Sequence, residues 1–186
     1  AGGLRPSAEL WARLHESSGY PAWALSPYDF MHRACPPGTK VLILSRGGRH
    51  HDILAAARHA HTLDRQVHGI LYGNRTPLAS LIREGSTENG VLILSGPEHQ
   101  EDPLRICRLV PIATLAAMVY GRGGPYAPCF SVRAPKVPSA APEQIIALGG
   151  GLASPAAVDF ALRCSEAGIA PCRATDARNF SHGIAR

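Results

Sequence analysis

The chain has 186 residues, 45% of them hydrophobic and 18% charged, which is typical of a globular protein with one sizeable core. No apolar run is long enough to cross a bilayer, and Ala1–Arg5 does not lead into the apolar core of a signal peptide. The formal net charge of +5 comes from scattered arginines, and only 6% of the residues are aromatic, which argues against nucleic-acid binding. We therefore expect a cytoplasmic protein with a solvated basic surface and no membrane-spanning helix.

The cysteines form no CxxC pair and lack the ligand spacing of a zinc site, so the sequence predicts no metal. Reduced thiols are the simplest expectation for such a chain. Cys164 falls inside a predicted helix, where a packing role is favoured over that of a nucleophile. The five cysteines are Cys35, Cys107, Cys129, Cys164 and Cys172.

Strand and helix patterns alternate along the first half of the chain. Leu10, Trp11 and Leu14 share one face of a predicted first helix, which Gly19 is placed to end. The continuous apolar runs Val41–Leu44 and Val91–Leu94 predict strands that are buried on both faces, as in a parallel sheet. A further strand is predicted at Val67–Tyr72. Helices are predicted from Asp52 onward, over Pro77–Arg83, and from Pro103 to about Tyr120.

The stretch from Gly121 to Pro142 is rich in proline and glycine and predicts a linker. The alternation then resumes with a strand at Ile145–Leu148 and a glycine turn. Ser154 is the expected N-cap of the next helix, with Pro155 at its first position, and Gly168 is placed to end it. Alternating elements of this kind predict an α/β fold with a doubly wound parallel sheet.

Three glycine-rich loops are expected between strands and helices, at Ala1–Gly3, Ser45–His50 and Gly149–Gly151. In an open parallel sheet such loops meet at the carboxyl edge, where backbone N–H groups and helix dipoles attract anions. Because Arg46, Arg49 and His50 belong to the second loop, the sequence predicts an anion site, with phosphate as its ligand.

Two further patterns carry alternative interpretations. Gly149, Gly151 and Ser154 partly match the dinucleotide-binding fingerprint, with Asp176 as the candidate ribose-binding acid. Glu166 and His182 are a carboxylate and an imidazole that could move protons between adjacent carbons of a sugar. An exposed last-turn glutamate and a surface histidine would look the same in the sequence.

The chain resembles the sugar isomerase (SIS) family, and within it the isomerase half of glucosamine-6-phosphate synthase. Val41–His50 is similar to the family's strand and its Ser-Gln-Ser-Gly-Glu-Thr phosphate loop, although Gly47 and His50 replace two hydroxyl residues. Arg163–Glu166 falls on the family's Lys-Leu-Lys-Glu, and Ser181–Gly183 falls on its Lys-His-Gly, with the same interval from the glutamate to the histidine. Isoleucine 184 stands where the family has proline.

The resemblance implies a flavodoxin-like, doubly wound SIS fold in which one nearly complete domain is followed by the start of a second. Residues 1–124 would form the first SIS domain, with its first strand apparently missing, residues 125–142 a Pro/Gly-rich linker, and residues 143–186 the incomplete second domain. Glu166 would be the base, and His182 would open the sugar ring in its own subunit or in a neighbouring one. The implied phosphate and ligand contacts are Gly2, Gly3, Ser45, Arg46, Gly47, Gly48, His50, Gly150 and Arg163.

The implied activity is that of an aldose–ketose isomerase, or a related deglycase or deaminase, acting on a sugar phosphate or amino-sugar phosphate. It would need no cofactor and no metal, and a homodimer or higher homo-oligomer is expected. The alternatives are a non-catalytic sugar-phosphate sensor and a nucleotide-binding α/β domain.

Overall fold

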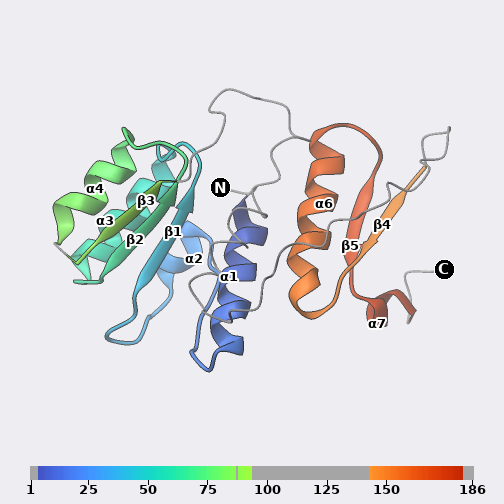
Figure 1. Cartoon of the computed structure of the whole chain (residues 1–186), viewed down its shortest axis with the longest axis horizontal. Coiled ribbons are helices and arrows are strands. Elements are labelled where there is room, and N and C mark those ends of the chain that lie inside the picture. The colour runs from blue at the N-terminus through green and yellow to red at the C-terminus, as the bar shows by residue number, and fades with distance from the viewer. Residues whose placement is uncertain (1–3, 87, 94–142, 182–186) are drawn as a thin grey trace, which may run out of the picture. The chain divides into compact units, whose positions relative to one another are not determined.

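The computed structural model of the chain describes residues 4–86, 88–93 and 143–181 (Figure 1). Internal contacts divide the chain into two compact units: residues 1–8 and 24–100 form the first unit, and residues 9–23 and 101–186 the second. None of the helices in these described ranges combines the length and apolar character needed to span a bilayer. The predicted helix from Pro103 and the predicted linker 125–142 lie outside the described residues.

The predicted first helix is confirmed as α1, Arg5–Ser17. Gly19 adopts a φ of +90° just beyond it, and its N–H donates to the carbonyl of Glu16 over 2.9 Å. This left-handed conformation is the common way to end a helix, and it strongly favours glycine.

The first unit contains a three-stranded parallel sheet of β1 (Val41–Ser45), β2 (Val67–Leu71) and β3 (Gly90–Ile93), in the order β1-β2-β3. Helices α3 (His51–Thr62) and α4 (Pro77–Gly85) connect these strands and contact both the sheet and each other (Figure 1). The strands follow one another in sequence order. A doubly wound sheet also needs a reversal of strand order, and the described strands contain none.

The core of the first unit lies between this sheet and its helices. Val67, Leu71, Leu78 and Ile82 have no solvent exposure, because the apolar face of α4 packs on the central strand β2. The short helix α2, Pro27–His32, packs against α3 and adds Phe30 to the same core. The sequence analysis did not predict α2.

The second unit contains a two-stranded parallel sheet of β4 (Ile145–Leu148) and β5 (Cys172–Thr175). Helix α6, Ser154–Glu166, connects the two strands and packs on both. Gly168, with a φ of +64°, lies just beyond α6, as predicted. A last short helix, α7 (Ala177–Asn179), follows β5.

The prediction that Ser154 is the N-cap of α6 is wrong. A 3₁₀ turn, Gly151–Ala153, leads directly into the helix, so Ala153 is the N-cap and Ser154 is already helical. The N–H of Ala153 donates to the carbonyl of Gly150, and that of Ser154 to the carbonyl of Gly151. These backbone bonds satisfy donors that a capping side chain would otherwise serve.

Candidate functional site

The loop between β1 and α3 is built on an internal hydrogen bond. Ser45, the last residue of β1, is buried, and its Oγ accepts from the N–H of Gly48 over 3.1 Å. The backbone carbonyl of Arg46 accepts from the N–H of Tyr72 at the end of β2, over 3.4 Å. Because these bonds fix the turn, the loop is held at the carboxyl end of the sheet.

Gly48 is required by its conformation and by its neighbours. Its φ is +57°, and a Cβ at this position would lie 2.6 Å from Thr76 Oγ1 and 2.8 Å from Thr76 Cβ. Its carbonyl accepts from the N–H of Leu78 over 3.1 Å. Through these contacts, the loop before α4 and the start of α4 support the predicted phosphate loop. Gly47, in contrast, is exposed and has open space where a side chain would project.

Helix α3 begins without a side-chain cap. The caps of α2, α4 and α7 are Ser26, Thr76 and Asp176, whose side chains accept from the backbone N–H of Asp29, Ala79 and Asn179 respectively. At α6, backbone hydrogen bonds of the preceding 3₁₀ turn take the place of a capping side chain. At α3 the N-cap is His50, whose backbone is extended and whose side chain makes no cap hydrogen bond. The first-turn N–H groups of α3 thus form a donor site directly behind the Ser45–Gly48 turn.

Charged and titratable side chains surround this helix start. The rings of His50 and His51 stack with their centroids 4.7 Å apart, and His51 Nε2 lies 2.7 Å from Asp52 Oδ1. Within the described residues, His50, His51 and Asp52 bring three possible metal-ligand atoms within 4.8 Å of one another. The positive end of the α3 dipole favours an anion here, whereas the carboxylate of Asp52 in the first turn opposes one.

The glycine turn after β4 has a packing role. The N–H of Gly149 donates to the carbonyl of Thr175 over 3.0 Å and so continues the β4–β5 ladder. A Cβ on Gly149 would lie 2.6 Å from the carbonyl oxygen of Ala153 and 2.8 Å from Ala157 Cβ. A glycine is needed here because α6 and the end of β4 approach each other too closely for a side chain. Gly150, the predicted ligand contact, is exposed, and its carbonyl accepts from Ala153.

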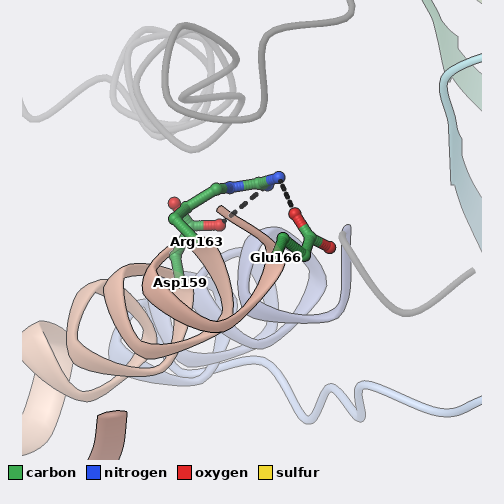
Figure 2. Close-up of polar contacts among 3 residues, drawn as sticks. All are labelled: Asp159, Arg163 and Glu166. Carbon is green, nitrogen blue, oxygen red and sulfur yellow. Dashed lines mark hydrogen bonds and ion pairs between the residues drawn. The ribbon is translucent and has the colours of Figure 1, made fainter. Parts of the chain in front are cut away.

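Arg163 binds two carboxylates of its own helix (Figure 2). Its Nη2 donates to Asp159 Oδ1 over 3.2 Å, and its Nη1 donates to Glu166 Oε2 over 2.9 Å. The Asp159 and Arg163 side chains are 7% and 11% exposed, while that of Glu166 is 46% exposed. The predicted ligand contact Arg163 and the predicted base Glu166 therefore form an ion pair. The buried Asp159 holds the Arg163 side chain in place.

The predicted site residues fall into three sets. Ser45, Arg46, Gly47, Gly48 and His50 form one loop of the first unit, whereas Gly150, Arg163 and Glu166 belong to the second unit. Gly2, Gly3 and His182 lie outside the described residues.

The sequence analysis missed two supporting residues and misjudged a third. Thr76 braces Gly48, and the pair Thr76-Pro77 is a recognisable cap signal. Asp159 anchors Arg163, and its i, i+4 spacing could have suggested the pair. Asp176, the acid required for the dinucleotide interpretation, instead caps α7, and both its carboxylate oxygens accept hydrogen bonds from Asn179.

Comparison with known proteins finds solved structures that are similar in fold over nearly the whole chain. No protein-family model and no curated protein sequence matches the chain. Among solved structures, glucosamine-6-phosphate deaminase from Thermotoga maritima has a TM-score of 0.75 at 18% identity, over 98% of this chain and 61% of that one. Tagatose-6-phosphate ketose/aldose isomerase from Escherichia coli has a TM-score of 0.72 at 17% identity, over 98% of this chain and 56% of that one.

A third similar structure is the C-terminal domain of glucosamine-fructose-6-phosphate aminotransferase from Francisella tularensis, with a TM-score of 0.62 at 14% identity. It matches 98% of this chain and 58% of its own. The chain thus spans less than two thirds of the length of each of these proteins. At this level of identity the similarity establishes the fold: the chain has the α/β fold with parallel strands of SIS-domain proteins.

Proposed function

We propose that the chain binds the phosphate of a sugar phosphate or amino-sugar phosphate in the Ser45–His50 loop. The observation that carries the proposal is the start of α3, where first-turn N–H groups have no capping side chain while α2, α4 and α7 have one. A phosphate at this point would accept from those N–H groups and interact favourably with the helix dipole.

The side chains of the loop support the same ligand. The Oγ of Ser45 accepts from Gly48, and within the part of the chain described here its hydroxyl makes no second hydrogen bond, so it can donate to a phosphate oxygen. Arg46 and His50 can add charge-assisted bonds, which replace the hydroxyls that the SIS phosphate loop has at positions 47 and 50. The fold similarity to a deaminase and an isomerase of hexose-type 6-phosphates favours this ligand class.

In the catalytic version of the proposal, the chain is an aldose–ketose isomerase or a related deglycase or deaminase. Glu166 would shuttle the proton between the two reacting carbons, and His182 would handle the ring oxygen during opening, within the same chain or from a second copy. Arg163 would then orient the Glu166 carboxylate through the hydrogen bond of 2.9 Å.

A sugar-phosphate sensor without turnover is the second candidate, and the Arg163–Glu166 ion pair is the observation that favours it. The carboxylate of Glu166 already accepts a hydrogen bond from Arg163 over 2.9 Å and is therefore engaged within its own helix. In a sensor the pair would simply hold the end of α6 together.

The binding proposal is tested by isothermal calorimetry of the full chain with glucosamine 6-phosphate, fructose 6-phosphate and tagatose 6-phosphate. Ser45→Ala removes a donor, and we expect it to weaken binding by roughly 0.5–1.5 kcal/mol. Ser80→Ala, on the exposed side of α4, is the matched control and should bind like the unaltered chain. If none of the three ligands gives a heat of binding or raises the melting temperature of the chain, sugar phosphates are ruled out as its ligand class.

The catalytic proposal is tested by coupled isomerase and ammonia-release assays of the same ligands. We expect Glu166→Gln to abolish turnover and to keep binding, because the amide has the same shape but cannot take the proton. Glu84→Gln, an exposed glutamate in the last turn of α4, is the control. Binding without turnover in the unaltered chain would instead identify the sensor.

A further inference from the structure

Two histidines and an aspartate follow one another at the start of α3. His51 Nε2 lies 2.7 Å from Asp52 Oδ1, and His50 Nδ1 lies 3.6 Å from Asp52 Oδ2. One possible ligand atom from each of the three residues lies within 4.8 Å of the other two. Among residues 4–86, 88–93 and 143–181, no other three histidine, cysteine or acidic side chains come together in this way.

Hydrogen bonding accounts for only part of this arrangement. The contact of 2.7 Å is a hydrogen bond when His51 Nε2 carries a proton. The separation of 3.6 Å between His50 Nδ1 and the second carboxylate oxygen is too long for one. Two ligands of one ion, at bond lengths of about 2.05 Å, lie about 2.9–3.4 Å apart in octahedral or tetrahedral geometry. The two observed separations bracket this range, so small side-chain rotations would bring the three residues onto a common ion.

The donor atoms select the class of metal. Two imidazoles and one carboxylate suit Zn²⁺ and its transition-metal neighbours Co²⁺ and Ni²⁺, whereas Mg²⁺ and Ca²⁺ prefer oxygen ligands alone. Three protein ligands leave at least one position of the ion open to water or to another ligand. The spacing of the cysteines, which gave the expectation of no metal, does not bear on this site because no thiol takes part in it.

The surroundings of the cluster set its affinity. The side chains of His50, His51 and Asp52 are 49%, 86% and 47% exposed, so they can rotate without moving the core. The two histidine rings are stacked with 22° between their planes and must turn before both can face one ion. The α3 dipole opposes a cation, and the Asp52 carboxylate favours one. We therefore expect micromolar binding, weaker than that of a preformed structural zinc site.

We propose that His50, His51 and Asp52 bind a divalent transition-metal ion of the Zn²⁺ class. His51 and Asp52 supply the closest pair of ligands, and His50 supplies the third. The site does not depend on the proposed sugar phosphate, because all three ligands come from the protein. It also gives a role to Asp52, whose charge opposes an anion at the same helix start.

Calorimetry of the whole protein with Zn²⁺ alone tests the proposal. We expect Zn²⁺ to bind and Mg²⁺ to give no heat under the same conditions. Losing only an outer-shell partner of a metal ligand costs about 10–100-fold in affinity, so removing a ligand should cost at least about tenfold. His51→Asn and Asp52→Asn should each show this loss. His32→Asn, which alters an exposed histidine of α2, is the matched control and should bind Zn²⁺ like the unaltered chain.

Nuclear magnetic resonance of the unaltered, isotope-labelled protein identifies the ligand atoms even if a variant folds poorly. Zn²⁺ should shift the ring nitrogens Nδ1 of His50 and Nε2 of His51, and the ring of His32 should stay unchanged. Absence of Zn²⁺ binding, equal binding of Mg²⁺, or unchanged affinity in His51→Asn and Asp52→Asn would overturn the proposal. Zn²⁺-induced shifts at other histidines in place of these two would overturn it as well.

Discussion

Arg163 holds Glu166 through a hydrogen bond of 2.9 Å and is itself held by the buried Asp159 over 3.2 Å. The proposed base is therefore the exposed end of a three-residue chain of charges along one face of α6 (Figure 2). The two ends of this chain should respond differently to substitution, because Asp159 is buried and Glu166 is half exposed.

Asp159→Asn should destabilise the protein clearly more than Glu166→Gln. Removing one partner of a buried ion pair costs about 3–5 kcal/mol, and we expect about 2–3 kcal/mol here because Arg163 keeps its bond to Glu166. Loss of the half-exposed glutamate charge should cost less than about 1 kcal/mol. Urea unfolding followed by circular dichroism measures both free energies. Equal losses would contradict the inference that Asp159 anchors the chain of charges.

Gly48→Ala should destabilise the first unit and disturb the phosphate loop. The left-handed conformation costs a non-glycine residue about 1–2 kcal/mol, and the added Cβ would meet Thr76. Gly47→Ala is the matched control, with open space at the same loop and an expected change within about 0.5 kcal/mol. Chemical denaturation gives the stability difference, and calorimetry with a sugar phosphate gives the effect on binding.

Thr76→Ala should lower the free energy of unfolding by about 1 kcal/mol, because it removes the cap hydrogen bond to the N–H of Ala79. Thr76→Ser keeps the hydroxyl and should retain most of the stability. Ser154→Ala should change stability by less than about 0.5 kcal/mol, since Ser154 is not the cap of α6. A large loss from Ser154→Ala would restore the capping role that the sequence suggested.

The thiol of Cys172 should ionise at higher pH in the folded protein than in the unfolded chain. Burial, and then the neighbouring Cys164 thiol, raise the pKa of Cys172 above its ordinary value. The resulting contribution to stability is fully present below the unfolded-state pKa of about 8.5 and is lost as the pH rises through the folded-state pKa. Iodoacetamide labelling of Cys172 against pH, with and without urea, measures the displacement. Coincident curves would refute it.

The strands could be predicted closely from the sequence. The predicted strands that start at Val41, Val67 and Ile145 are strands of the parallel sheets. The burial on both faces that continuous apolar runs predict is not complete, because Leu92 of β3 and Leu148 of β4 are 42% and 51% exposed. The helix start at Ser154 could not be predicted in the same way. A serine before a proline fits an N-cap equally well as a first helical residue, and only the preceding 3₁₀ turn decides between them.

The residue types of the candidate site could be recognised in the sequence, but their arrangement could not. Ser45 and Gly48 stand out in a glycine-rich loop after an apolar strand, and the structure places them in one turn. Spacing alone could not tell that Asp159 is buried, because its burial depends on what packs against its own face of α6.

The uncapped start of α3 has a consequence for protein engineering. The backbone of His50 already has the extended conformation of an N-cap, so His50→Ser should thermostabilise the protein by about 1 kcal/mol at no steric cost. Its hydroxyl would occupy the N–H donors that the proposed phosphate needs. Selection for heat resistance alone would therefore drive this position toward serine or aspartate, whereas selection for the proposed phosphate binding would oppose a capping side chain here.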